Sequence, residues 1–176
     1  MSRVRILGIG SPSGDDQAGW LTVDALAACG VRTDRELAIE KLDRPGANLI
    51  SLLDADWVIL VDAMQSGGPP GRIQGFDQNA WPDYTHGLSS HGLGVVDALM
   101  LAQALASLPP RLDLYGIEIG SVNPGETPGM AVRSAARQLA QHIAAELTAM
   151  SFGGLAPFPQ PSPAGGRGGK RDAQTD

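Results

Sequence analysis

The sequence predicts an α/β domain of three layers, αβα, in which a twisted, mostly parallel sheet is flanked by helices on both faces. Two observations favour this fold class. Short apolar segments alternate with segments of helical periodicity along most of the chain, which is typical of parallel sheets with helical connections. The segment 57–63, WVILVDA, is also apolar up to its aspartate, as expected of a central strand covered on both faces.

The apolar periodicity predicts the individual elements. Strands are expected at 4–10, 36–42, 57–63, 72–76 and 112–119. Helices are expected at 17–29, from Pro45 through the leucines near 50, at 94–107 and at 129–149. In the first helix Cys29 should face the core, where it acts as a small apolar residue, and Gly30 should end the helix.

The chain divides by composition into a body and a tail. Its 176 residues suffice for one domain, and we expect that domain to span residues 1–150. Residues 151–176 include ten glycines or prolines and show no apolar periodicity, so we expect a disordered Gly/Pro-rich tail. The tail carries a net charge of +1, which leaves −7 on the body.

Charge and cysteine content exclude several classes of protein. A net charge of −6 does not provide the basic surface that nucleic-acid binding needs. The single cysteine excludes an internal disulfide and fits a reducing compartment. We find no secretory signal and no apolar stretch long enough to span a membrane. We therefore expect a cytoplasmic protein without membrane partners, and a monomer because no extra apolar stripe is evident.

Four polar residues follow or end predicted strands or precede a predicted helix. The first strand leads to Asp15 and Asp16, the third ends at Asp62, and His91 precedes the helix at 94–107. Ligands of parallel sheets bind outside the carboxyl ends of the strands, so these side chains could converge there. Two carboxylates and an imidazole suit a divalent metal such as nickel, zinc or iron.

Three of these residues also have a structural interpretation, whereas a charge at Asp62 favours a role at the sheet edge. Asp15 or Asp16 would cap the first helix by accepting backbone N–H groups. His91 could likewise cap a helix or lie half-buried. Four further residues are candidates for lesser roles: Asp43 as a helix cap or a cleft residue, His86 as an alternative ligand, Glu118 as a supporting group or a solvated strand end, and His142 as a surface residue.

Motifs of other enzyme classes are incomplete or missing. Glycines 8, 10 and 14 resemble a dinucleotide-binding loop, but Ser13 stands where G-x-G-x-x-G needs its last glycine. The sequence contains neither G-x-S-x-G nor H-E-x-x-H, the signatures of serine hydrolases and zinc proteases. A nucleotide- or phosphate-binding module is the alternative function that this glycine loop leaves open.

Four segments together resemble the hydrogenase maturation protease family. They are ILGIGSPSGDDQAG, VILVDAMQSGGPPG, SSHGLGVVDAL and LPPRLDLYGIEIG, in this order, and with the following helix they span nearly all of residues 3–150. The resemblance implies a single α/β domain. It also implies an endopeptidase, of aspartyl or metal-assisted type, that removes the C-terminal extension of a nickel–iron hydrogenase large-subunit precursor after nickel insertion.

The resemblance also implies the site residues. The family's metal-contacting positions fall on Asp16, Asp62 and His91, which would be both catalytic residues and ligands of nickel carried by the substrate. The first loop departs from the family pattern, because it has Ser11 in place of asparagine, is one residue shorter, and has Gln17 where glycine is common. Asp15 could therefore take the place of Asp16, and a precursor-binding protein without proteolytic activity is a further alternative.

Overall fold

A mixed sheet forms the centre of the computed structural model, which describes residues 2–84 and 94–152. Within these residues the strand order is β2-β1-β3-β5-β4. β1, β2, β3 and β5 are mutually parallel, and β4 joins β5 in the antiparallel sense. The bounds of the strands are β1 (Arg3–Gly10), β2 (Glu36–Asp43), β3 (Trp57–Met64), β4 (Ile73–Phe76) and β5 (Arg111–Glu118). The predicted mostly parallel sheet is confirmed.

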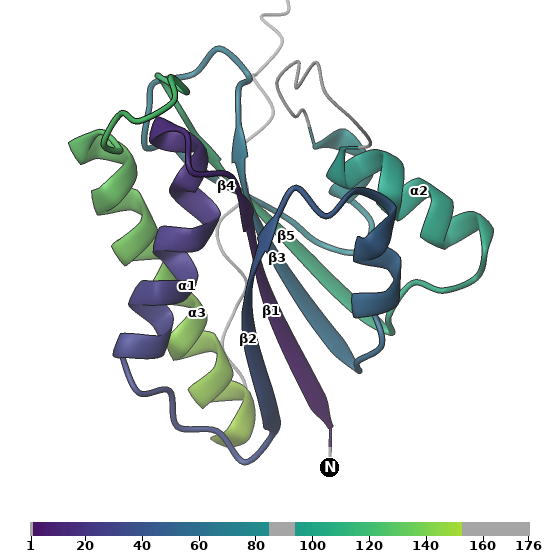
Figure 1. Cartoon of the computed structure of the whole chain (residues 1–176). Coiled ribbons are helices and arrows are strands. Elements are labelled where there is room, and N and C mark those ends of the chain that lie inside the picture. Colours follow the sequence, from purple (N-terminus) through teal and green to yellow (C-terminus); the bar gives the residue numbers. More distant parts are fainter. Residues whose placement is uncertain (1, 85–93, 153–176) are drawn as a thin grey trace, which may run out of the picture.

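Helices cover both faces of this sheet (Figure 1). α1 (Ala18–Ala28) and α3 (Met130–Phe152) lie on one face, and α2 (Val95–Ala104) lies on the other. The three-layer αβα architecture predicted from the sequence is therefore confirmed. The segment after Pro45 forms a 3-10 helix, η2 (Gly46–Leu52), beside α2. α3 continues to Phe152, past its expected end at Ala149, and the remainder of the predicted tail, 153–176, lies outside the described residues.

Alternate residues of the central strands supply two apolar cores. In β3, Ile59 and Val61 face α1 and α3, whereas Val58 and Leu60 face α2 and η2. All four are fully buried. β3 has a continuous apolar run because both of its faces are covered, as expected for a central parallel strand. None of the helices within 2–84 and 94–152 has the length and apolarity to cross a membrane.

α1 packs on β1 through two glycines. A Cβ atom added to Gly8 would lie 2.4 Å from the carbonyl oxygen of Gly19, and one added to Gly19 would lie 2.2 Å from the carbonyl oxygen of Ile9. This close approach turns Thr22 and Val23 into the core. Cys29, just beyond the helix, is exposed, so its predicted burial is wrong. Gly8 therefore has a packing role that requires no bound phosphate.

Candidate functional site

The chain reverses its direction across the sheet between β1 and β3. From β1 it passes by α1 to β2 on one side, and from β2 it returns by η2 to β3 on the other side. The segments that follow β1 and β3 therefore diverge, which is the arrangement that opens ligand crevices in parallel sheets. Asp16 follows β1 and Asp62 lies near the carboxyl end of β3. Two of the three predicted site residues thus lie at this switch point.

Asp16 is held by the first residue after β1. The Ser11 hydroxyl donates a hydrogen bond to Oδ2 of Asp16, and the Ser11 backbone N–H donates to the Asp16 carbonyl at 3.3 Å. Ser11 is buried while Asp16 is only half-buried. The serine that departs from the family pattern therefore orients the carboxylate, and the short loop forms a 3-10 turn, η1 (Gly14–Gln17).

Asp62 is held by its own strand and by a tyrosine. Its Oδ1 accepts the backbone N–H of Ala63 at 2.9 Å. The Tyr84 hydroxyl donates to the Ala63 carbonyl at 2.9 Å and to Asp62 Oδ2 at 3.3 Å, in a shared hydrogen bond. Burial, followed by repulsion from the Asp16 carboxylate, raises the pKa of Asp62 to about 7. A group with its pKa near neutrality can take up or release a proton under working conditions.

Asp16 and Asp62 lie close enough for their charges to interact, because the Asp16 carboxylate contributes to the raised pKa of Asp62. Two carboxylates that repel each other form a natural place for a cation, because a cation removes the repulsion. The Tyr84 hydroxyl is kept protonated, since burial and then the Asp62 charge raise its pKa well above the usual value. Tyr84 can therefore serve as a hydrogen-bond donor to Asp62 at neutral pH.

Asp15 has a different position from Asp16. Its carboxylate accepts the backbone N–H groups of Gly129 at 2.6 Å, Gly120 at 2.9 Å and Ser121 at 3.3 Å. Its own N–H donates to the Ser121 carbonyl at 2.8 Å. Asp15 is 5% exposed and turned toward the connection between β5 and α3. Its oxygens are thus already used within the chain, and the aspartate of this loop whose charge acts on Asp62 is Asp16.

The capping role expected of this aspartate pair falls on another helix. Neither η1 nor α1 has a side-chain hydrogen bond at its N-cap. Asp15 instead binds the N–H of Gly129, and the carbonyl of Gly129 accepts the N–H of Arg133 in the first turn of α3. A carboxylate is favourable there because it meets unpaired N–H groups and the positive end of the helix dipole.

Glu118 supports the segment that follows β3. Its carboxylate accepts the Ser66 hydroxyl at 2.6 Å and the backbone N–H groups of Ser66 and Gly67 at 2.8 and 3.0 Å. The side chain is buried, so the solvated strand end considered for Glu118 is wrong and the supporting role is consistent with its contacts. Glu118 fixes the chain shortly after Asp62.

The remaining candidate residues lie in different parts of the chain, and none of those described joins Asp16 and Asp62. Asp43 is the last residue of β2, and its carboxylate pairs with Arg44. His142 is half-buried against the ring of Tyr115, with centroids 6.0 Å apart, so its assignment to the surface is wrong. The predicted ligand His91 and the alternative His86 both lie outside the described residues. Within residues 2–84 and 94–152 no group of three potential ligands is assembled.

Three residues of the site were not predicted from the sequence. Ser11 appeared only as a departure from the family pattern, Tyr84 had no signal because its partner is 22 positions away, and Arg44 appeared in none of the motifs. Arg44 donates its backbone N–H to the Gly10 carbonyl at 3.2 Å and lies within electrostatic reach of Asp16. A basic residue at the end of β2, opposite an acidic loop, was the available signal.

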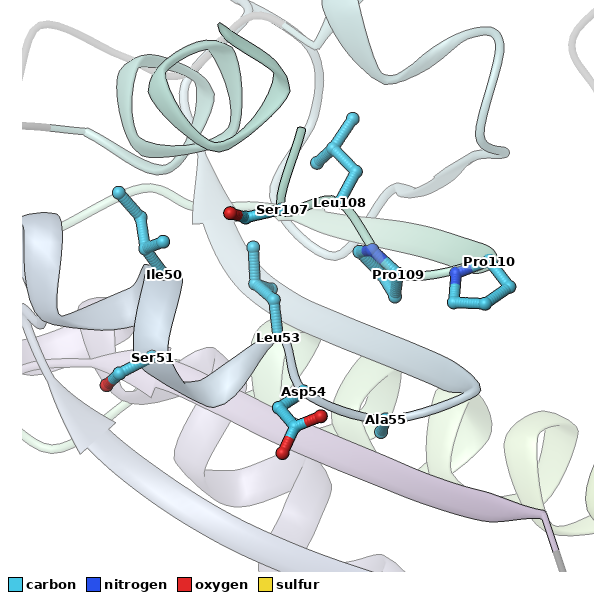
Figure 2. Close-up of a pocket in the computed structure, with 9 residues that line it drawn as sticks. All are labelled: Ile50, Ser51, Leu53, Asp54, Ala55, Ser107, Leu108, Pro109 and Pro110. Atoms are coloured by element: carbon cyan, nitrogen blue, oxygen red, sulfur yellow. The ribbon is translucent and has the colours of Figure 1, made fainter. Parts of the chain in front are cut away.

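A separate hollow lies at the opposite end of the sheet. Its volume is about 470 Å³, and it lies between the end of η2 and the connection from α2 to β5 (Figure 2). Leu53, Ala55 and Pro110 border it near the amino ends of β3 and β5. Because Asp16 and Asp62 lie at the carboxyl ends, this hollow is not part of the candidate site.

The fold and the acidic pair at the switch point define an α/β domain with a candidate site at the carboxyl edge of the sheet. Residues 45–146 match the family model of the hydrogenase maturation protease, HycI. This match covers more than half of the chain, which therefore belongs to the hydrogenase maturation protease family. The suspected family is confirmed, and the protein is a protease of hydrogenase maturation.

Solved structures of the same fold agree with this assignment. The hydrogenase maturating endopeptidase HybD from E. coli is similar with a TM-score of 0.72 and 24% identity, over 84% of this chain and 93% of that chain. The [NiFe] hydrogenase maturation protease HycI from Thermococcus kodakarensis KOD1 is similar with a TM-score of 0.64 and 28% identity, again over 84% and 93%. No curated protein matches the chain.

Proposed function

We propose that this protease removes the C-terminal extension of a nickel–iron hydrogenase large-subunit precursor after nickel has been inserted. The observation that carries the proposal is the pair Asp16 and Asp62, two carboxylates coupled at the switch point with the pKa of Asp62 raised to about 7. Two carboxylate oxygens and an imidazole form a donor set that suits nickel. Asp16, Asp62 and His91 would contact nickel that arrives with the substrate.

In this proposal the chain's own residues position the precursor. Ser11 and Tyr84 orient the two carboxylates, so that the metal-loaded substrate meets a preformed pair. Binding of a cation would displace the proton that Asp62 holds near neutrality. Contact with the metal would hold the adjoining peptide in register for hydrolysis, and such positioning contributes several kcal/mol to catalysis. When bound, nickel could polarise a carbonyl group or lower the pKa of a water molecule.

A precursor without nickel would not be held in this way. Asp62 would then keep its proton near neutrality, and the precursor would lack the binding free energy that contact between the metal and the two carboxylates provides. The arrangement therefore supports a checkpoint in which cleavage follows metal insertion. We further propose that the protein acts as a cytoplasmic monomer, in keeping with its exposed free cysteine, which suits a reducing compartment.

The test compares nickel-loaded and nickel-free precursor. Wild type, Asp62→Ala and His91→Ala are incubated with each form, and the mass of the large subunit is followed. Asp24→Ala is the matched control, because Asp24 is an exposed carboxylate of α1 that pairs with Lys41. We expect cleavage only with nickel-loaded precursor and only by wild type and the control. Equal cleavage of both precursor forms would contradict recognition of nickel, and stable binding without any mass change would indicate a non-catalytic binder.

The glycine loop does not favour the alternative of nucleotide binding. A Cβ atom on Gly10 would lie 2.5 Å from the Asp16 carbonyl oxygen, and one on Gly14 would lie 2.7 Å from the Ser121 carbonyl oxygen. Gly14 also has a φ of +51°, which glycine adopts without cost. With Gly8 packed on α1, each of the three glycines is explained by contacts within the chain.

A further inference from the structure

Arg44 adopts a backbone conformation that does not suit an arginine. Its φ is +42°, in the left-handed region that favours glycine and, to a lesser degree, asparagine. The next residue is Pro45, and a residue before proline is further restricted toward extended conformations. A long side chain that persists in such a conformation is held there by its surroundings, and residues of this kind concentrate at functional sites.

The surroundings of Arg44 place it at the edge of the candidate site. Its backbone N–H donates to the carbonyl of Gly10, the last residue of β1, at 3.2 Å. The next residue along, Ser11, carries the hydrogen bonds to Asp16. The hydrogen bond to Asp43, then the charge of Asp43 and, more weakly, that of Asp16 raise the pKa of the Arg44 guanidinium. Arg44 is therefore a fixed positive charge within electrostatic reach of Asp16.

The contacts within the described residues do not account for this arginine. Its Nε pairs with Asp43 Oδ1 at 2.7 Å, and the side chain is 66% exposed. Exposed ion pairs stabilise proteins very little, so the pair does not offset the backbone strain. Glycine or asparagine would fit this turn better. What arginine offers at this position, and glycine or asparagine does not, is the guanidinium group, whose fork of donors extends beyond the single pair made by Nε.

We propose that Arg44 determines specificity by binding a carboxylate of the precursor segment that lies across the site. The inference rests on the proposed function. Asp16, Asp43 and Asp62 make this edge of the sheet negative, so an acidic segment would be repelled without a cation. A guanidinium binds carboxylates with paired, charge-assisted hydrogen bonds. The carboxylate belongs either to an acidic side chain near the cleaved bond or to the C-terminus of the extension.

Kinetic comparison of three variants tests the role of Arg44. Arg44→Asn removes the charge and tolerates the backbone conformation, and Arg44→Lys keeps the charge without the fork. Arg3→Asn is the control, because Arg3 is an exposed arginine with one ion pair, to Asp54, at the amino end of β1. With nickel-loaded precursor, we expect Arg44→Asn to raise KM roughly tenfold with little change in kcat. Arg44→Lys should lie between, and Arg3→Asn should match wild type.

Thermal unfolding separates this role from a structural one. Because asparagine relieves the strain, Arg44→Asn should have an equal or higher Tm than wild type, while its KM rises. A KM equal to that of wild type, under conditions where wild type cleaves the precursor, would overturn the inference and leave the proposed function intact. A wild type that cleaves no precursor would overturn both.

Altered precursors identify the carboxylate. In one, the acidic side chains of the extension and of the residues before the cleaved bond are changed to their amides. In the other, a short Gly-Ser segment is added to the C-terminus, which moves the terminal carboxylate away. With the altered precursor that lacks the bound carboxylate, wild type should show a KM raised roughly tenfold. Arg44→Asn should then raise the KM for that precursor no further. If Arg44→Asn still raises KM tenfold with both altered precursors, a carboxylate ligand is excluded.

Discussion

The carboxylate of Asp15 accepts the backbone N–H of Gly129 at 2.6 Å, across 114 positions of sequence. It also accepts the N–H groups of Gly120 and Ser121. One buried side chain thus joins the loop after β1 to the start of α3. Since the next residue is Asp16, this connection also fixes where the candidate ligand lies.

Substitutions of these two adjacent aspartates should therefore affect different properties: stability for Asp15 and cleavage for Asp16. Asp15→Ala leaves three N–H groups without their acceptor, and we expect it to lower the free energy of unfolding by about 2–4 kcal/mol. Asp16→Ala removes a half-buried carboxylate that repels Asp62, so stability should change by less than about 1 kcal/mol while cleavage is lost. Urea unfolding and precursor cleavage measure the two effects. Equal loss of stability in both variants would contradict a structural role for Asp15 that Asp16 does not share.

We expect the Tyr84 hydroxyl to influence the reaction through the pKa of Asp62. Its hydrogen bond lowers the pKa of Asp62, so Tyr84→Phe should raise that pKa further and shift the acid limb of kcat/KM toward higher pH. The ring contact with Phe76, with centroids 5.4 Å apart, is kept in the variant. Tyr115→Phe is the control, since its hydroxyl donates at 3.2 Å to Glu146, which α3 contributes. An unchanged acid limb in Tyr84→Phe would show that this hydroxyl does not act on the reaction.

The elements of this fold could be predicted because their signals are local. The apolar run of β3 and the periodicity of α3 each lie within one segment, and both elements formed, although α3 continues to Phe152, past its expected end. The orientation of α1 could not be predicted in the same way. Its buried face is set by the close approach of Gly19 to Gly8, a steric effect between two segments that apolar periodicity does not register.

The site was predictable in part for the same reason. Asp16 and Asp62 follow strands, so the rule for parallel sheets brought them to one edge. The roles of Asp15 and Tyr84 depend on partners 114 and 22 positions away. Their sequence surroundings contain no trace of those partners. The contribution of His91 stays a prediction, since it lies outside the described residues.

The raised pKa of Asp62 predicts how the stability of the metal-free protein depends on pH. The folded pKa, about 7, lies above the ordinary value of 3.8. The folded state therefore binds the proton more tightly, and this stabilisation is complete below pH 4 and is lost as pH rises through 7. Asp62→Asn stays uncharged, so relative to wild type it should gain about 1–3 kcal/mol between pH 5 and pH 8.

Urea unfolding at pH 5, 6, 7 and 8 with a chelator present measures this gain. Asp24→Asn serves as the control, because Asp24 is an exposed carboxylate. Its difference from wild type should stay constant over the same range. A constant difference for Asp62→Asn as well would show that Asp62 does not hold its proton near neutrality.

A polar cluster where β3 and β5 begin should affect stability without affecting the site. Arg111 pairs with Glu146 at 2.6 Å and Asp113 at 2.9 Å, and its guanidinium lies 3.8 Å from the ring centroid of Trp57. Glu146 is buried. Arg111→Met would leave both carboxylates without their cation, and we expect the free energy of unfolding to fall by about 2–4 kcal/mol.

A second substitution, Glu146→Leu, shows whether the lower free energy of unfolding comes from a buried carboxylate left without its cation. In the double variant Arg111→Met with Glu146→Leu, an apolar contact replaces the pair, so much of the lost stability should return. Cleavage by both variants, measured well below their unfolding temperatures, should match wild type, because Arg111 lies at the amino end of the sheet and Asp62 near the carboxyl end of β3. A loss of activity in the folded double variant would show that the two ends of the sheet are coupled.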